Sequence, residues 1–217
     1  YYGGGKEAAK PLYNKYNMEL IGWWIYGQES FASSKPIEKV ADFKDWKFRS
    51  PPGMETKIFE KLGASPIVMD FTEIFTALET GIIDGADASG LANNVGLGLY
   101  DIVKYANFPG FHSMPSDHLA CNKDVFAAMP EHHQKIMKVG MEALALRTAL
   151  TFEKANAEAA ATLREQGVTL SQWAPEELGK FRAAAQATWP EFATTPEAEA
   201  LVASHMAYLA QLGLVSE

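Results

Sequence analysis

The sequence contains little that would link it to a nucleic acid, a membrane or a disulfide-stabilised fold. Its single cysteine, Cys121, cannot form a disulfide within the chain, and a buried thiol is a commoner role for it than a nucleophile. Lysine and arginine form no block that could follow a phosphate backbone, and the net charge is −8. No apolar run reaches the roughly 18 residues that span a bilayer. We therefore expect no nucleic-acid partner and no direct membrane insertion.

The apolar content is sufficient for a full hydrophobic core. The chain has 217 residues, of which 47% are hydrophobic, and this length allows one large domain or two small ones. Residues 1–20 lack the basic start and apolar middle of a signal peptide, and the first residues resemble the interior of a longer protein. The lack of a signal peptide therefore carries no information about location.

Turn and cap signals divide the first half of the chain into short elements. Pro51 and Pro52 lack backbone donors and end one predicted strand, and Asp70 with Glu73 has the spacing of a helix capping box. The pattern predicts strands over residues 17–26, 46–50, 65–69 and 82–86, with helices beginning after residues 53 and 70. Because strands alternate with helices of about 10 residues, we predict an α/β fold with parallel strand pairing.

The second half of the chain is predicted to be mostly helical. Residues 131–166 contain no proline and predict one very long helix or two abutting helices. Pro175 and Pro196 each suit the first position of a further helix. Short strands are expected over residues 118–121 and 168–170.

Arg49 is the first candidate ligand contact. It stands at the end of a predicted strand, just before two prolines and a glycine. A guanidinium stays charged, so it cannot serve there as core filling, and its planar fork of donors suits a carboxylate or a phosphate. The alternative is a surface ion pair with a nearby acidic side chain.

Three motifs in this order resemble the extracytoplasmic solute-binding subunits of TRAP transporters, the DctP-type family. Residues 42–44 read DFK and lead to RSP at residues 49–51, residues 62–66 read LGASP, and residues 75–85 read FTALETGIIDG. Residues 167–182 are also similar to the C-terminal region of the family. The resemblance covers nearly all of the chain.

The resemblance implies a bilobed α/β fold of the periplasmic-binding-protein type with a long interlobe helix. Residues 1–26 and 115–154 would form a partial first lobe, and residues 27–114 and 155–217 the second. The chain would then cover about the C-terminal two-thirds of such a protein, with the N-terminal part missing. The implied function is periplasmic: the protein captures a small organic acid in an interlobe cleft and delivers it to integral membrane TRAP permease subunits.

The resemblance also assigns residues of the binding site. Arg49 matches the arginine that clamps a substrate carboxylate, and Phe71 matches an apolar pocket residue. Asp87 falls where relatives carry a glutamate, whereas Ala88 replaces the asparagine or tryptophan of other members. A structural role is the alternative for each of them: core packing for Phe71, and helix capping or a solvated acid for Asp87.

Further ligand contacts are expected close to these residues. Ser89 and Asn93 belong to a segment that looks most like the branch of the family binding 2-oxo acids, and His112 lies in a turn from which it could donate to a ligand. Trp23 and Trp24 end a predicted strand, where alternation directs them to opposite faces. One of the two could line the cleft, with core packing as the alternative.

The same comparison bears on ligand charge and on metal binding. Many relatives have a second arginine where this chain has Gln28 and Glu29, so Gln28 is a candidate contact and a ligand with one carboxylate plus hydroxyl or carbonyl groups is expected. In the 2-oxo acid branch a second cation-binding carboxylate would lie near Ser113, which carries no charge. Because Ca²⁺ prefers several carboxylate oxygens, we expect no metal and no cofactor.

Two other functional classes compete with transport. Asp84, Asp87 and His112 could be imagined as a hydrolytic set, but no nucleophile with a base forms a recognisable motif, so we expect no enzyme. A carboxylate-sensing module on the same fold is the second alternative, because fold does not decide function.

Overall fold

In the computed structural model, residues 3–215 are described, and their contacts divide them into two compact units. Unit 1 comprises residues 3–25, 116–149 and 189–215, and unit 2 comprises residues 26–115 and 150–188. The two lobes expected for the whole protein, with their residue ranges, stay a prediction. Within this chain, however, residues from Trp189 onward belong to unit 1, because helix α9 (Pro196–Gln211) packs on helix α1 (Gly5–Asn14). An ion pair between Lys15, just after α1, and Glu197 of α9 adds to this contact.

Unit 1 is built around a two-stranded antiparallel sheet, in which Trp23 pairs with His118. The buried side chains of Ile21, Phe126 and Met141 form its core cluster. Both strands of this sheet were predicted from the sequence. In addition to α1 and α9, the elements of unit 1 are β1 (Met18–Ile25), β7 (Ser116–Asn122), α6 (Lys123–Ala128), the first part of α7 (Glu131–Glu165) and the end of α8 (Pro175–Phe192).

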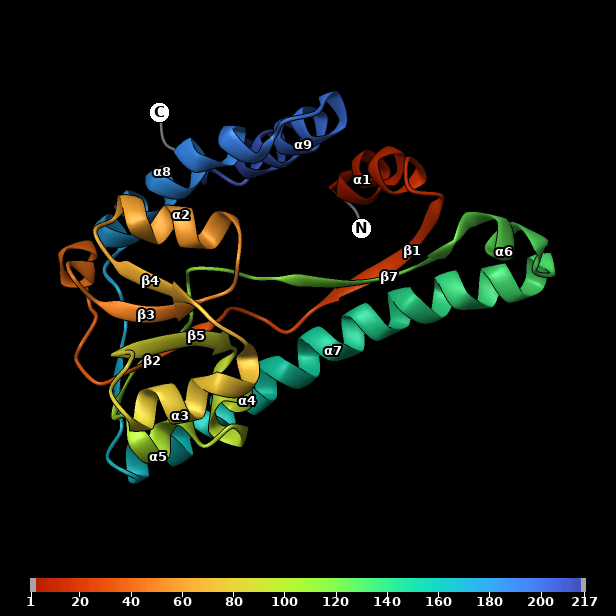
Figure 1. The fold of residues 1–217 in the computed structure, drawn as a ribbon. Coiled ribbons are helices and arrows are strands. Elements are labelled where there is room, and N and C mark those ends of the chain that lie inside the picture. Colours follow the sequence, from red (N-terminus) through yellow and green to blue (C-terminus); the bar gives the residue numbers. More distant parts are fainter. Residues whose placement is uncertain (1–2, 216–217) are drawn as a thin grey trace. The chain divides into compact units, whose positions relative to one another are not determined.

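Unit 2 contains a six-stranded mixed sheet with the order β4-β3-β5-β2-β6-β8, of which Figure 1 labels the first four strands. Besides parts of α7 and α8, its elements are β2 (Ser30–Ser33), η1 (Val40–Phe43), β3 (Lys47–Ser50), α2 (Met54–Lys61), β4 (Ser65–Val68), η2 (Phe71–Glu73), α3 (Ile74–Glu79), β5 (Gly85–Ser89), α4 (Leu91–Gly96), α5 (Leu99–Ile102), β6 (Tyr105–Asn107) and β8 (Thr169–Ser171).

The predicted parallel pairing is confirmed for β3 with its neighbours β4 and β5 and for β6 with β8. It does not extend to β2, which pairs antiparallel with β5 and β6 and which the sequence pattern did not reveal. The capping box is also present: Thr72 N donates to Asp70 Oδ1 (2.9 Å), and Asp70 N donates to Glu73 Oε2 (3.1 Å).

The strand predicted over residues 82–86 is shifted in the structure, where β5 runs from Gly85 to Ser89. Ile82 belongs to a turn and is 56% exposed, and the backbone of Ile83 donates to Ala77 at the end of α3. A Cβ at position 85 would overlap the indole ring of Trp46, so glycine is required where the strand begins. The strand therefore starts where the backbone can approach its neighbour closely.

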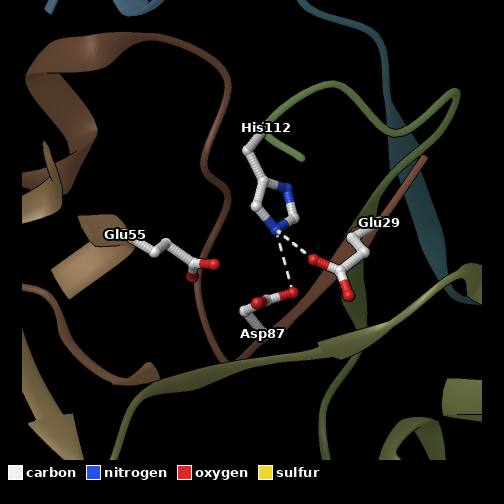
Figure 2. A group of neighbouring side chains, drawn as sticks. All are labelled: Glu29, Glu55, Asp87 and His112. Atoms are coloured by element: carbon white, nitrogen blue, oxygen red, sulfur yellow. Dashed lines mark hydrogen bonds and ion pairs between the residues drawn. The ribbon is translucent and has the colours of Figure 1, made fainter. Parts of the chain in front are cut away.

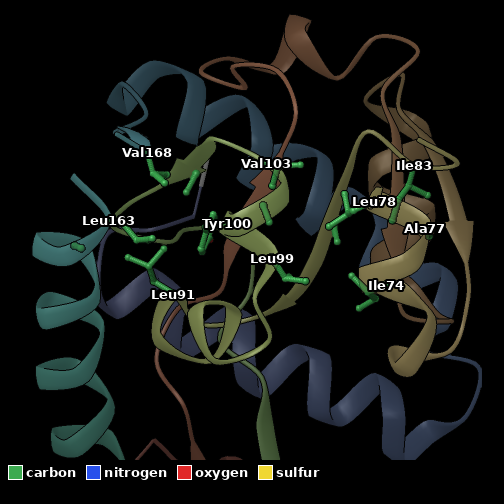
Figure 3. Packing of buried hydrophobic residues seen from close by; sticks show 14 residues of the cluster. Ile74, Ala77, Leu78, Ile83, Leu91, Leu99, Tyr100, Val103, Leu163 and Val168 are labelled. Atoms are coloured by element: carbon green, nitrogen blue, oxygen red, sulfur yellow. The ribbon is translucent and has the colours of Figure 1, made fainter. Parts of the chain in front are cut away.

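The two faces of the unit 2 sheet bury different side chains. Adjacent residues of β2 point in opposite directions: Phe31 belongs to an aromatic cluster with Trp46 and Phe59, and Ala32 belongs to an aliphatic cluster. The aliphatic cluster includes residues of α3, α5 and the C-terminal part of α7, among them Leu163 (Figure 3). Both faces are covered, as is typical of an α/β fold.

Residues 131–165 form one continuous helix, α7, which settles the choice between one long helix and two short ones. Its first part belongs to unit 1 and its last part to unit 2. The helices predicted to open at Pro175 and Pro196 are α8 and α9. Within the described residues, no helix is both long and apolar enough to cross a membrane.

Candidate ligand-binding site

Arg49 is held at the end of β3 by two backbone carbonyl groups. Its Nη1 donates to the carbonyl oxygen of Asp87 (2.8 Å), and its Nε donates to that of Met69 (3.4 Å). Its Cζ lies 5.7 Å from the centroid of the Phe71 ring, and the residue is only 8% exposed. Among residues 3–215 no carboxylate lies within ion-pairing distance of the guanidinium, whose Nη2 group keeps its donors for another acceptor.

Next to Arg49 lie three carboxyl groups and one imidazole, which we call the acid–histidine cluster: Glu29, Glu55, Asp87 and His112 (Figure 2). One ligand atom from each lies within 4.8 Å of the others. His112 Nε2 is 2.9 Å from Asp87 Oδ1 and 3.7 Å from Glu29 Oε2. The imidazole is fully buried, and Asp87 is 2% exposed. The cluster is therefore an internal network of charges.

Segments far apart in the sequence bring the cluster together. Glu29 precedes β2, and its backbone N donates to the carbonyl oxygen of Ser113 (3.1 Å), while the Ser113 hydroxyl donates to Glu29 Oε2. Gly110 permits this approach, because a Cβ there would overlap the carbonyl group of Glu29. The His112 ring is in turn stacked on Phe31, with 4.4 Å between the ring centroids.

The cluster shifts the acidities of its own members. Burial, followed by the charge of Asp87 and a hydrogen bond to it, raises the pKa of Glu55 to about 10. Burial and the Asp87 charge likewise raise the pKa of Glu29. Burial opposes the ionisation of Asp87 and His112, but their mutual attraction and hydrogen bond lower the pKa of Asp87 and raise that of His112. At neutral pH the network therefore contains an ionised Asp87 and a neutral Glu55, and the raised pKa of His112 favours its protonated form.

A hollow of about 430 Å³ opens beside Phe71. Ser89 and Asn93 lie in its wall, and Asn93 Nδ2 donates to Ser89 Oγ (2.7 Å). The first turn of α4 is fixed from α7, because Asn156 Oδ1 accepts the backbone N–H of Ala92 (2.9 Å). The lining residues are Tyr26, Phe71, Ala88, Ser89, Ala92, Asn93, Gly96 and Leu97.

Six of the predicted contacts gather in this part of unit 2. Arg49, Asp87 and His112 are linked through hydrogen bonds, and Phe71 connects Arg49 to the hollow. The remaining two, Ser89 and Asn93, line the hollow together with Phe71. Their roles in ligand binding stay predictions.

The other three predicted contacts are not among these residues of unit 2, and their roles in ligand binding also stay predictions. Gln28 is exposed and does not line the hollow. Trp23 and Trp24 belong to β1 in unit 1, on its opposite faces: the Trp23 ring lies against Gly5 of α1, and Trp24 packs on the core cluster that contains Phe126. Within unit 1 both tryptophans therefore have the packing roles considered as their alternative.

Sequence reasoning missed Glu29 and Glu55 as members of the site. The sequence places the uncharged Ser113 near the expected second carboxylate position, and in the structure the Ser113 hydroxyl donates to Glu29 Oε2, so a carboxyl group lies beside it. A weak signal for Glu55 was available, since it stands in the first turn of a helix directly after the Arg49 strand and two prolines. No local pattern marks Glu29.

Sequence comparison connects this site to one protein family. Residues 2–195 match the family DctP, described as bacterial extracellular solute-binding protein, family 7. The chain belongs to this family. The match confirms the resemblance carried by the motifs around Arg49 and at residues 75–85, and the DctP family and its fold are those of solute-binding proteins.

Two curated relatives are similar over most of this chain. The sialic acid-binding periplasmic protein of Vibrio cholerae is 24% identical over 190 residues, which are 87% of this chain and 57% of that protein. A monocarboxylate 2-oxoacid-binding periplasmic protein of Nostoc sp. is 26% identical over 187 residues, 81% of this chain and 49% of that protein. The chain thus spans about half the length of the curated relatives it matches.

A solved structure confirms the fold over the whole chain. A TRAP periplasmic solute-binding protein from Rhodobacter sphaeroides, in an apo open state, superposes with a TM-score of 0.84 and is 32% identical. The superposition covers 100% of this chain and 69% of that one. The α/β fold of the periplasmic-binding-protein type is therefore established for this chain.

Proposed function

We propose that the full protein is a periplasmic solute-binding protein that captures a small organic acid and delivers it to a TRAP-type membrane permease. Membership of the DctP family supports the transport role, and two relatives whose names specify an acid ligand support the class of solute. The interlobe cleft, the closure of two lobes on the ligand and the permease partner are parts of the same proposal.

The state of Arg49 is the observation that carries this proposal. A buried guanidinium with an unused pair of donors, fixed by carbonyl groups rather than by a carboxylate, is prepared for an anion. The neighbouring network supports the same role, because the neutral Glu55 does not compete with a ligand carboxylate for the positive charge. Bidentate binding of one carboxylate on Arg49 would fix the orientation of the acid.

We further propose that protons, not a bound cation, hold the acid–histidine cluster together. Ca²⁺ binds deprotonated carboxylate oxygens, whereas here His112 donates to Asp87 and Ser113 donates to Glu29. The raised pKa values of Glu29 and Glu55 favour protonated carboxyl groups. The same four side chains would be the ligands if a cation did bind.

A binding role is favoured over an enzymatic one. Asp87 and His112 are both deeply buried and occupied by each other, which leaves no exposed base for a hydrolytic reaction at this pair. A carboxylate sensor would use the same site. Ligand binding with no turnover would favour a binding role over an enzyme, and a complex with a TRAP permease would favour transport over sensing.

Thermal unfolding of the full-length protein tests the proposal against a panel of 2-oxo, 2-hydroxy, aromatic, sugar and dicarboxylic acids, with and without Ca²⁺. We expect at least one acid to raise the Tm, and Arg49→Ala to weaken its binding at least tenfold, because a hydrogen bond to a charged group contributes roughly 1.5–3 kcal/mol. Titration calorimetry gives the affinity.

The matched control is Arg182→Ala, since Arg182 is exposed on α8 of the same unit. It should leave the affinity unchanged. Equal affinities of Arg49→Ala and the wild type would show that Arg49 is not a ligand contact. If no acid shifts the Tm, the proposed class of solute is wrong. A Tm shift that requires Ca²⁺ would show that the acid–histidine cluster is a metal site and is not held together by protons.

A further inference from the structure

Among the described residues, those that line the hollow next to Arg49 carry no charge. Its eight lining residues are apolar or small, except for Tyr26, Ser89 and Asn93. A charge taken out of water without a partner is unfavourable. A ligand whose carboxylate binds Arg49 would therefore find no counter-charge in the hollow for a second carboxylate or for an amine.

Besides the Tyr26 hydroxyl, the polar part of the wall contains the Ser89–Asn93 pair, which offers a hydroxyl donor and an amide acceptor side by side. Asn93 Nδ2 donates to Ser89 Oγ, so the Ser89 hydroxyl still has its own hydrogen to donate. The Asn93 Oδ1 atom remains an acceptor, and among the described residues neither group has a further hydrogen-bond partner. A ligand hydroxyl matches both, since it can accept from Ser89 and donate to Asn93, whereas a keto oxygen can only accept.

The remaining wall is apolar and partly open to solvent. Phe71 is 43% and Leu97 is 37% exposed, and Ala88 and Ala92 lie beside them in the wall. A volume of about 430 Å³ lies within the usual range of roughly 300–1,000 Å³ for small-molecule sites. Covering these side chains with hydrocarbon would contribute apolar burial to binding.

The chain places this hollow next to the carboxylate position. Phe71 lies under the Arg49 guanidinium and also lines the hollow. Ala88 and Ser89 follow directly after Asp87, whose carbonyl oxygen accepts from Arg49. One small molecule can therefore contact both regions.

We propose that the ligand is a monocarboxylic hydroxy acid with an uncharged, mainly apolar body. This inference rests on the proposed function, because it takes Arg49 as the carboxylate contact. The carboxylate binds Arg49, the hydroxyl binds the Ser89–Asn93 pair, and the apolar body covers Phe71 and Leu97.

Titration calorimetry on the full-length protein with matched acids tests this assignment. The probes are 2-hydroxy-4-methylpentanoate, 3-hydroxy-4-methylpentanoate, the parent 4-methylpentanoate, 4-methyl-2-oxopentanoate and malate. One of the hydroxy acids should bind about tenfold or more tightly than the parent acid, since loss of a matched hydroxyl leaves site groups unpaired. The same hydroxy acid should also bind more tightly than 4-methyl-2-oxopentanoate. Malate should bind more weakly than both of these acids.

Two serine variants separate a specific contact from a general effect. Ser89→Ala should bring the ratio of the hydroxy-acid and parent-acid affinities close to one. Ser34→Ala, at an exposed serine of the same unit that does not line the hollow, should leave the ratio as in the wild type.

The possible failures are distinguishable. Equal affinities for the parent and hydroxy acids, tighter binding of malate, or an unchanged ratio in Ser89→Ala would overturn this inference and leave the organic-acid function standing. A folded protein that binds none of the five acids and none of the wider acid panel would contradict both.

Discussion

Two neighbouring regions of unit 2 treat charge in opposite ways. The acid–histidine cluster brings three carboxyl groups and an imidazole together in a mostly buried space, where they hydrogen-bond to one another and shift one another's pKa values. The hollow beside Phe71 contains no charged side chain in its wall. Arg49 contacts both, through the carbonyl group of Asp87 and the ring of Phe71.

This difference separates two tasks of a binding site. The cluster is costly to desolvate and is held in one geometry by its pairs, so it can orient Arg49 through Asp87 without offering its own charges to the ligand. In the proposed site the hollow has few polar groups, so shape and the contact with a ligand hydroxyl would decide which acid binds. Under that proposal, positioning and selectivity reside in different side chains, and each can be altered alone.

The largest effect is expected from removal of the central carboxylate. Asp87→Ala removes the nearest carboxylate of the buried His112, at 2.9 Å, and leaves Glu29 at 3.7 Å, so it should lower the free energy of unfolding by about 3–5 kcal/mol at neutral pH. Urea unfolding measures it. Asp101→Ala, at an exposed aspartate of the same unit, should change stability by no more than about 0.5 kcal/mol. Equal losses in the two variants would show that the cluster has no special role.

A pH-dependent effect is expected from Glu55→Gln. An unfolded glutamate ionises near pH 4.3, whereas Glu55 keeps its proton up to about pH 10 in the native state. The native protein then binds one more proton than the unfolded chain, so this group lowers stability as pH rises, by at most about 1.4 kcal/mol per pH unit. Glutamine does not titrate, and the variant should become more stable relative to wild type from pH 5 to pH 8.

Urea unfolding at several pH values gives this difference directly. Glu60→Gln is the control, because Glu60 is an exposed residue of the same helix, α2. The change of this difference with pH should be much smaller for Glu60→Gln than for Glu55→Gln. A flat difference for Glu55→Gln as well would mean that the Glu55 carboxyl is ionised in the native protein.

The smallest effect is expected on the hollow side. Phe71→Ala removes an aromatic ring that is 43% exposed, so stability should fall by less than about 1 kcal/mol, while affinity for an organic acid should fall several-fold. Phe75→Ala is a close control: Phe75 is 41% exposed but does not line the hollow. Similar affinity losses in Phe71→Ala and Phe75→Ala would show that the hollow contributes no more to binding than another exposed part of the surface.

Local signals predicted much of the fold. Two prolines after Arg49, the Asp70–Glu73 capping box and Pro175 at a helix start depend only on neighbouring residues, and the structure contains each of them at the predicted place. The start of β5 could not be read this way. Two isoleucines resemble a strand, but the close approach of Gly85 to Trp46 decides where pairing begins.

The site was predictable where it depends on one segment and unpredictable where it depends on several. Arg49 and Phe71 follow strand ends within a short stretch, and the structure brings them together. Glu29 reaches the cluster only because Gly110 allows two distant segments to approach closely. Sequence spacing contains no record of such a contact, so Glu29 was not among the predicted site residues.

The most direct test of the account is a crystal structure of the full-length protein with the tightest-binding acid of the panel. The account predicts both oxygens of the ligand carboxylate within hydrogen-bonding distance of the Arg49 guanidinium, with the acid–histidine cluster unchanged. A ligand bound elsewhere, with Arg49 still contacting only the carbonyl groups of Asp87 and Met69, would contradict it.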